Sequence, residues 1–222
     1  GWNPRVPELL INEINPKGSK STPDCAELFA LTDGNLGGLM FVIGTEGNAN
    51  DTLVFPAVEI SKGDYIVIHT KPEGIPEEID ETEEVNASGG RLALETARDF
   101  WMRDAPGLPS NNGAVTLYQR KGGDIIDAVI WSNRADAPEE DDLGWTSAAF
   151  PWAQDIGVQG EWTADGEIPL PSETLPVDSS TATRSLCRGS IPSDSNSPDD
   201  WHTVPTRGQT FGMINIDEVY EP

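Results

Sequence analysis

Short apolar runs that end at turn-forming residues recur along this chain, and they constrain its fold more than any other feature. Residues 9–14, 25–31, 64–69 and 114–118 are examples. Their length and composition are typical of β-strands. Gly (22) and Pro (18) are abundant among the 222 residues, and both residues break helix interiors. These patterns predict an all-β protein, built as a sandwich or a barrel.

The clearest local prediction is a β-hairpin. Residues 114–118 and 125–131 are two apolar runs, and the segment 121–124 between them contains two glycines. A short Gly-containing connection between two such runs is typical of a tight hairpin turn.

Two segments interrupt the strand pattern. Residues 75–90 include six carboxylates within 77–84, and this density of charge predicts a solvated loop. Residues 132–182 form a long insertion rich in Pro, Asp, Glu and Trp, in which we expect a short helix near 138–150. A second helical segment is expected over Thr96–Arg103.

The tryptophans of the insertion have two interpretations. They seal the insertion onto the sandwich, or they form an exposed contact surface, since aromatic side chains give a large contact area at low entropy cost. Both interpretations stay open for Trp145, Trp152 and Trp162.

Charge limits the partners of the chain. The sequence has 14 Lys and Arg against 38 Asp and Glu, a formal net charge of −24. Nucleic-acid affinity depends on Lys and Arg that displace counterions, so nucleic acid is excluded as a partner. The same charge opposes binding to anionic lipid. No apolar run approaches the ~20 residues of a transmembrane helix.

The chain has two cysteines, Cys25 and Cys187. A disulfide between them would stabilise the fold by about 4–5 kcal/mol in the chain-entropy description. The alternative is two separate buried thiols, and two cysteines alone do not decide between these possibilities. Because the sequence starts at Gly1 without an initiator methionine, we expect that an export or lipoprotein signal has been removed.

The order of several motifs resembles the lamin tail domain family, which occurs in nuclear lamins and in many exported bacterial proteins. Residues 10–14 (LINEI) are similar to a first strand that typically includes V-N-E-I. The strongest match is LPSNNGAVTL followed by GDIIDAV, which resembles L-x-N-x-G-x-x-V-x-L and G-x-x-I-D-x-V. Further similar segments are residues 24–29, 60–65, 185–188, 194–196, 200–201 and 206–212.

The resemblance implies an all-β fold, an immunoglobulin-like antiparallel β-sandwich with an irregular insertion. It covers roughly residues 8–131 and 181–215, so we expect one domain over 8–215 with the insertion at 132–182 and a tail at 216–222. It also implies an extracytoplasmic location, as a secreted protein or an outer-surface lipoprotein.

Several charged residues are expected to have structural roles inside this sandwich. Glu27 shares a strand face with Cys25 and Phe29, so its carboxylate needs hydrogen-bond donors. We expect Glu27 or Glu13 to be satisfied internally, by Arg188 in a charge-assisted pair or by backbone N–H groups. The expected structural set is Glu13, Glu27, Asp127 and Arg188.

The sequence offers little for catalysis. His69 and His202 are its two histidines, and it contains no hydrolase, zinc-peptidase, P-loop or dinucleotide motif. We therefore expect no catalytic residue and no cofactor. The alternative is a bound calcium ion, which takes roughly six to eight oxygen ligands and so needs a cluster of acidic side chains. The best local cluster for calcium is Asp194, Asn196, Asp199 and Asp200. The alternative is that these are turn residues whose side chains bind their own backbone.

These observations together favour a non-catalytic binding or structural module of an exported, cell-surface bacterial protein, with a protein or glycan at the cell surface as its partner. Two alternatives stay open. One is a calcium-dependent adhesion or ligand-binding domain, and the other is an accessory domain of a hydrolase. The sequence does not indicate the oligomeric state.

Overall fold

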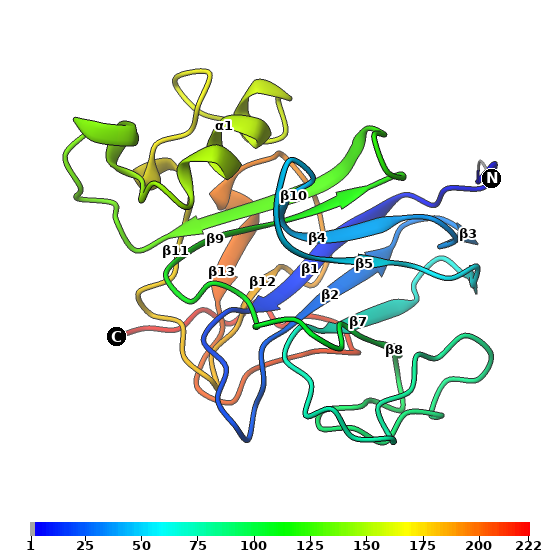
Figure 1. The fold of residues 1–222 in the computed structure, drawn as a ribbon. Helices are drawn as coiled ribbons and strands as arrows, with labels where there is room; N and C mark the ends of the chain where they lie inside the picture. Colours follow the sequence, from blue (N-terminus) through cyan, green and yellow to red (C-terminus); the bar gives the residue numbers. More distant parts are fainter. Residues whose placement is uncertain (1–2) are drawn as a thin grey trace.

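Two β-sheets pack face to face in the computed structural model, which describes residues 3–222 (Figure 1). The first sheet has six strands, in the spatial order β13 (Trp201–Thr203), β12 (Leu186–Arg188), β1 (Leu9–Asn15), β2 (Cys25–Ala30), β7 (Tyr65–His69) and β8 (Arg98–Trp101). The second has five, in the order β11 (Leu175–Pro176), β10 (Ile125–Ser132), β9 (Asn112–Tyr118), β4 (Met40–Thr45) and β5 (Asn48–Val54). A small third ladder pairs β3 (Gly34–Asn35) with β6 (Glu59–Ile60).

The predicted all-β sandwich is therefore confirmed. Most neighbouring strands run antiparallel, whereas β7 with β8 and β10 with β11 are parallel pairs at sheet edges. Between the sheets lie the apolar residues of alternating strand positions, such as Ile11 and Leu28 from the first sheet and Phe41 and Val115 from the second, all 0% exposed. Burial of each such side chain contributes about 1.5–3 kcal/mol.

The structure contains the predicted hairpin, formed by β9 and β10. Their register runs from Tyr118 opposite Ile125 to Asn112 opposite Ser132, with a shift next to Asp127. A register shift of this kind redirects a side chain, and Asp127 reaches across to β1 of the other sheet. The hairpin thus positions one charged residue of the site described below.

The insertion lies against the five-stranded sheet, where α1 (Phe150–Val158) contacts β4 and β9 (Figure 1). Two short 3₁₀ helices flank it, η1 (Asp141–Gly144) and η2 (Pro171–Glu173), and a third, η3 (Pro198–Asp200), precedes β13. The helix expected near 138–150 is placed too early, because Pro151 fits only the first turn of a helix and so sets its start.

The helix expected over Thr96–Arg103 is wrong. Four of these residues form β8, which pairs in parallel with β7. Sheet hydrogen bonds at this edge override a weak local preference for helix.

The outer face of the six-stranded sheet is also covered. Leu92 and Leu94 of the acidic loop (residues 75–97) and Phe211 of the C-terminal segment (residues 205–217) pack against Cys25 and Val67. Polar residues on this outer face are therefore buried. Of the helices in residues 3–222, none is long and apolar enough to cross a membrane.

Candidate functional site

Arg188 and Asp127 link the two sheets in the interior of the sandwich. Arg188 Nε donates to the Ile11 carbonyl at 2.8 Å, and its Nη2 lies 3.3 Å from Asp127 Oδ2. Asp127 Oδ2 accepts the Ile11 N–H at 2.6 Å. The two side chains thus satisfy both backbone groups of Ile11, where the pairing of β1 with β2 shifts register. Unpaired, these buried groups would each cost about 1–3 kcal/mol.

The charge of Arg188 is shared among several carboxylates. Asp194 lies 3.2 Å and Asp200 3.4 Å from its guanidinium, which also lies 4.8 Å from the Trp201 ring centroid. Burial raises the pKa of Asp127 to about 7, although the Arg188 charge opposes this rise. The cluster is a structural clamp between the sheets and a loop.

Two of the four residues predicted to bind calcium lie at this clamp. The carboxylates of Asp194 and Asp200 face Arg188. Asn196 donates its N–H to Asp194 Oδ1, and Asp199 is exposed. Within residues 3–222, no group of three or more His, Cys, Asp or Glu residues is placed to hold a metal ion. Calcium binding stays a prediction, and it would have to compete with Arg188 for two of the ligands.

Glu13 and Glu27 form a second cluster on the opposite, outer face of the six-stranded sheet. They lie directly across from one another on β1 and β2, and both are 0% exposed. Glu13 accepts hydrogen bonds from Ser185 Oγ (2.5 Å), the Thr210 N–H (3.1 Å) and Thr210 Oγ1 (2.8 Å). Its partners come from a distant part of the chain, the C-terminal segment and the residue before β12.

Glu27 also binds the C-terminal segment. It accepts the Gly212 N–H at 2.5 Å and an Asn12 side-chain N–H at 2.7 Å. Of the two arrangements expected for Glu13 and Glu27, the structure contains the one with backbone N–H donors. The ion pair with Arg188 is wrong, because Arg188 points to the opposite side of β1, toward Asp127. No Lys or Arg within residues 3–222 forms an ion pair with either glutamate.

This arrangement favours protonated carboxyls. Burial raises the pKa of Glu13 to about 7, against hydrogen bonds that lower it. The pKa of Glu27 is raised well above its usual 4.5, first by burial and then by the neighbouring Glu13 charge. Two carboxylates in one dry site cannot both ionise at low cost, so the pair retains protons near neutral pH.

A third buried cluster contains the residue types of a nucleophilic triad. His69 Nε2 lies 2.7 Å from Asp99 Oδ1, the His69 ring stacks on Trp101 at 3.7 Å, and Cys25 is opposite His69 in the β2–β7 register. His69, Asp99 and Cys25 are each at most 1% exposed. Burial raises the pKa of the Cys25 thiol well above its usual value. A thiolate is the reactive form, so this cluster lacks both access for substrate and an activated nucleophile.

The acidic loop is not simply solvated, contrary to the expectation for residues 77–84. Glu78 is 1% exposed and accepts the N–H groups of Glu73 (2.6 Å) and Gly74 (2.8 Å). Glu81, also 1% exposed, accepts the N–H groups of Ser88 (3.0 Å) and Asp99 (2.9 Å). Gly74 has a φ of 78°, a conformation that lets neighbouring N–H groups converge on one carboxylate. This glycine is the one local feature of the sequence that indicates a buried glutamate in the loop.

Of the two interpretations of the insertion's tryptophans, the structure supports the seal and not the exposed contact surface. The side chains named for it are 3–5% exposed, and the indole N–H groups donate to backbone carbonyls: Trp145 to Pro169, Trp152 to Asn48 and Trp162 to Glu173. A large ring with its polar atom satisfied gains most from burial, so these residues seal the insertion.

The possible disulfide between Cys25 and Cys187 is also wrong, since both cysteines are free and buried. β1 lies between β12 and β2. Cys187 is opposite Glu13 and Cys25 is opposite Asn15, so the two strand spacings of about 9–10 Å are a lower bound for their separation, already beyond the ~7 Å between Cα atoms that a disulfide spans. Cys187 Sγ instead lies 3.6 Å from His202 Nε2.

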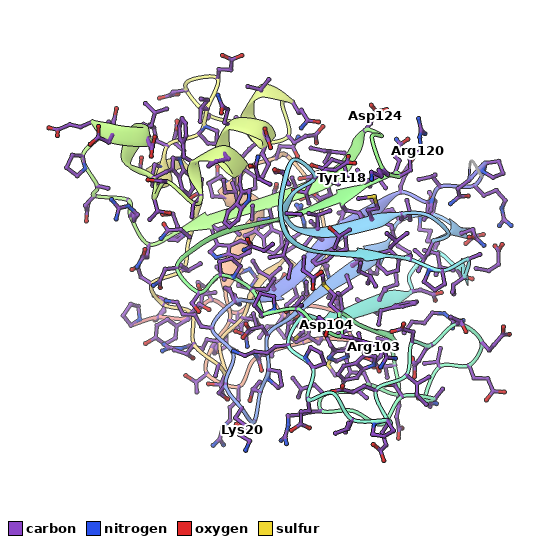
Figure 2. All side chains as sticks on the ribbon, in the orientation of Figure 1. Lys20, Arg103, Asp104, Tyr118, Arg120 and Asp124 are labelled. Carbon is purple, nitrogen blue, oxygen red and sulfur yellow. The ribbon has the colours of Figure 1, made fainter. Side chains whose placement is uncertain are left out.

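Open clefts lie at the ends of the sandwich, away from the buried charges. One of about 500 Å³ is lined by Arg5 and Glu59, which form an ion pair at 2.9 Å. Another, of about 440 Å³, is lined by Lys20, which Figure 2 places at the tip of the β1–β2 loop, far from Asp124 on the β9–β10 hairpin. None of the buried charges described above lines either cleft.

The fold and these clusters define an all-β sandwich in which buried ionisable groups hold distant segments together. More particularly, the chain belongs to the family described as "TP_1001_2nd: protein second domain", whose model matches residues 7–203.

A relative from Treponema pallidum (strain Nichols), named "Uncharacterized protein", is 32% identical over 177 residues, which cover 77% of this chain and 44% of the relative. The chain thus spans less than half the length of that relative. A crystal structure of a DUF4876 family protein from Bacteroides thetaiotaomicron VPI-5482 is similar at 12% identity and a TM-score of 0.43, covering 91% of this chain and 69% of that one.

Proposed function

We propose that this chain is a non-catalytic binding or structural module within a longer, exported bacterial protein at the cell surface. The observation that carries the proposal is the burial of reactive groups. The Cys25–His69–Asp99 set and the Glu13–Glu27 pair are each at most 1% exposed. An enzyme must present its base, nucleophile or metal to a substrate, whereas these groups bind only other parts of the chain.

Three further observations support the proposal. The T. pallidum relative is a bacterial protein more than twice as long as the aligned segment, so a modular role fits. The face-to-face packing of two mostly antiparallel sheets is compatible with the proposed kinship to lamin tail domains, and sandwiches commonly serve as spacers or as binding units through their loops and edges. The net charge of −24 keeps such a module soluble and away from anionic lipid.

Protease accessibility on intact cells tests the location. The full-length protein, carrying an epitope in the exposed β9–β10 turn, is expressed in the bacterium that encodes it and treated with proteinase K. We expect the epitope to be lost from intact cells, while a cytoplasmic control protein survives. Loss of the epitope only after lysis would contradict a cell-surface location.

An activity screen tests the non-catalytic part. The purified 222-residue chain is assayed with generic phosphatase, nuclease and esterase substrates, beside a Cys25→Ala variant. We expect turnover at the background level for both proteins. Turnover that the Cys25→Ala change removes would refute the proposal. An accessory role beside a hydrolase predicts the same inactive chain, with activity only in the rest of the longer protein.

A further inference from the structure

The edges of the two sheets differ in how they are closed, and this difference points to an interaction surface. An open strand edge presents unpaired N–H and C=O groups to any other extended chain. At β8, Asp80 Oδ1 accepts the Trp101 N–H (2.8 Å), Glu81 Oε2 accepts the Asp99 N–H (2.9 Å), and the Glu81 N–H donates to the Asp99 carbonyl (3.0 Å). The acidic loop therefore closes this edge.

Two other edges are closed in different ways. At β13, the Tyr220 N–H donates to the Thr203 carbonyl at 2.8 Å, and the Tyr220 ring lies 4.0 Å from the Arg184 guanidinium carbon. At the edge of the five-stranded sheet, β11 has two residues, one of which is Pro176, so it offers little backbone for pairing.

The fourth edge, β5, is long and open. Phe55 N–H donates to the Leu39 carbonyl of the adjoining segment. Because backbone groups alternate in direction along a strand, the odd-numbered residues from 51 to 55 face β4. Thr52 and Val54 therefore direct their backbone groups away from the sheet, whereas Asn50 is the extra residue where the β4–β5 register shifts and the alternation breaks.

Nothing in residues 3–222 pairs with these outward backbone groups except one carboxylate. Asp51 Oδ1 accepts the Thr52 N–H at 2.7 Å. Val54 is 58% exposed, unusual for a β-branched side chain on a strand. Figure 1 shows β5 at the edge of the five-stranded sheet, whereas the helix α1 lies against β4 and β9 of that sheet.

Charge indicates the chemistry of the occupant. Residues 36–61 contain no Lys or Arg, and their charged side chains are Glu46, Asp51 and Glu59. A second copy of this chain would bring another −24 charge and a second Asp51 to the same edge, and like charges across a strand pair are destabilising. A basic segment would instead be attracted.

We propose that β5 is a docking edge, at which an extended basic segment of a partner protein pairs with residues 51–54 as an added strand. Main-chain hydrogen bonds would supply the affinity, and contacts with Asp51 and Val54 the selectivity. This inference rests on the proposed function, because it names the partner that the proposed binding module would bind. It fails or stands independently of the cell-surface location.

Hydrogen exchange with a defined probe tests the proposal on the whole chain. The probe is the peptide acetyl-Lys-Thr-Val-Lys-Val-Thr-Lys-Val-amide, and the control peptide has Glu in place of Lys. We expect the lysine peptide to slow amide exchange at Val54 at least about tenfold, with little change elsewhere, while the glutamate peptide has no effect at equal concentration. Equal protection by both peptides, protection elsewhere, or none at millimolar peptide would overturn the proposal.

Two variants at one position separate backbone pairing from side-chain contact. Val54→Pro removes an outward N–H group that β4 does not use, and an edge strand tolerates proline. We expect at least about tenfold weaker peptide binding for Val54→Pro and less than about threefold weakening for Val54→Ala. Protection of Val54 in the free protein that disappears on dilution would show self-pairing instead, and would refute a basic partner.

Discussion

Replacement of Glu13 by Gln should remove a large part of the pH dependence of stability. The folded chain holds a proton on Glu13 up to a pKa of about 7, whereas the reference value is 4.5. Between these values the folded state binds more protons than the unfolded state, so stability falls as pH rises and becomes level above pH 7. At about 1.4 kcal/mol per pKa unit, the loss between pH 4 and pH 8 is about 3 kcal/mol.

The hydrogen bonds around Glu13 can accommodate the glutamine. The remaining oxygen can accept from Ser185 Oγ and the Thr210 N–H, and the new NH₂ group can donate to Thr210 Oγ1, which has Asn215 Oδ1 at 3.1 Å as its own acceptor. We therefore expect Glu13→Gln to be close to the parent in stability at pH 4.5 and up to about 3 kcal/mol more stable at pH 8.

Urea unfolding followed by tryptophan fluorescence at pH 5, 6, 7 and 8 measures this effect. The matched control is Glu8→Gln, an exposed residue just before β1, and its pH profile should follow that of the parent. Glu27→Gln should act in the same direction, and the double variant should gain less than the sum because the two carboxyls are coupled. A difference between parent and Glu13→Gln that does not change with pH would refute the reasoning.

Three further predictions concern the other buried groups. Arg188→Ala should cost about 3–5 kcal/mol of unfolding free energy, because it leaves buried carboxylates without their cation; a smaller cost than for Arg188→Lys, measured in the same urea series, would contradict the clamp. Glu81→Gln should cost about 1–2 kcal/mol, since one of the two N–H groups that it binds loses its acceptor, whereas the exposed Glu83→Gln should change stability by less than about 0.5 kcal/mol. Cys25 and Cys187 should both react with a thiol reagent in denaturant without reductant and react slowly in the native protein; a single mass consistent with an internal bond would disprove free thiols.

The sequence was sufficient to predict the elements that depend on the pattern of neighbouring residues. The alternation in β9 and β10 and the turn between them are sufficient to predict a hairpin. The strand face of Glu27 likewise showed that its carboxylate needs donors. The identity of those donors could not be predicted, because the Thr210 and Gly212 N–H groups are backbone atoms about 200 residues away, and every residue type except proline has one.

The same limit explains the errors. Asp127 and Arg188 meet only because two sheets pack with one particular offset, which neither strand encodes alone. Glu78 and Glu81 resemble solvated charges in composition, yet the loop folds around them. The Cys25–Cys187 disulfide fails for a similar reason, since the strand order of the sheet, not the sequence spacing, sets their separation.

The first strand depends on residues near the other end of the sequence. The Ile11 carbonyl accepts a hydrogen bond from a side chain 177 positions later, and the Glu13 carboxyl accepts one from an N–H group 197 positions later. A nascent chain emerging from the ribosome therefore exposes β1 without Arg188 and the Thr210 N–H group until those residues have emerged, and contacts of such long sequence separation form slowly. We expect ribosome-stalled chains that end before residue 205 to stay sensitive to protease, and resistance to arise only once the C-terminal segment has been released.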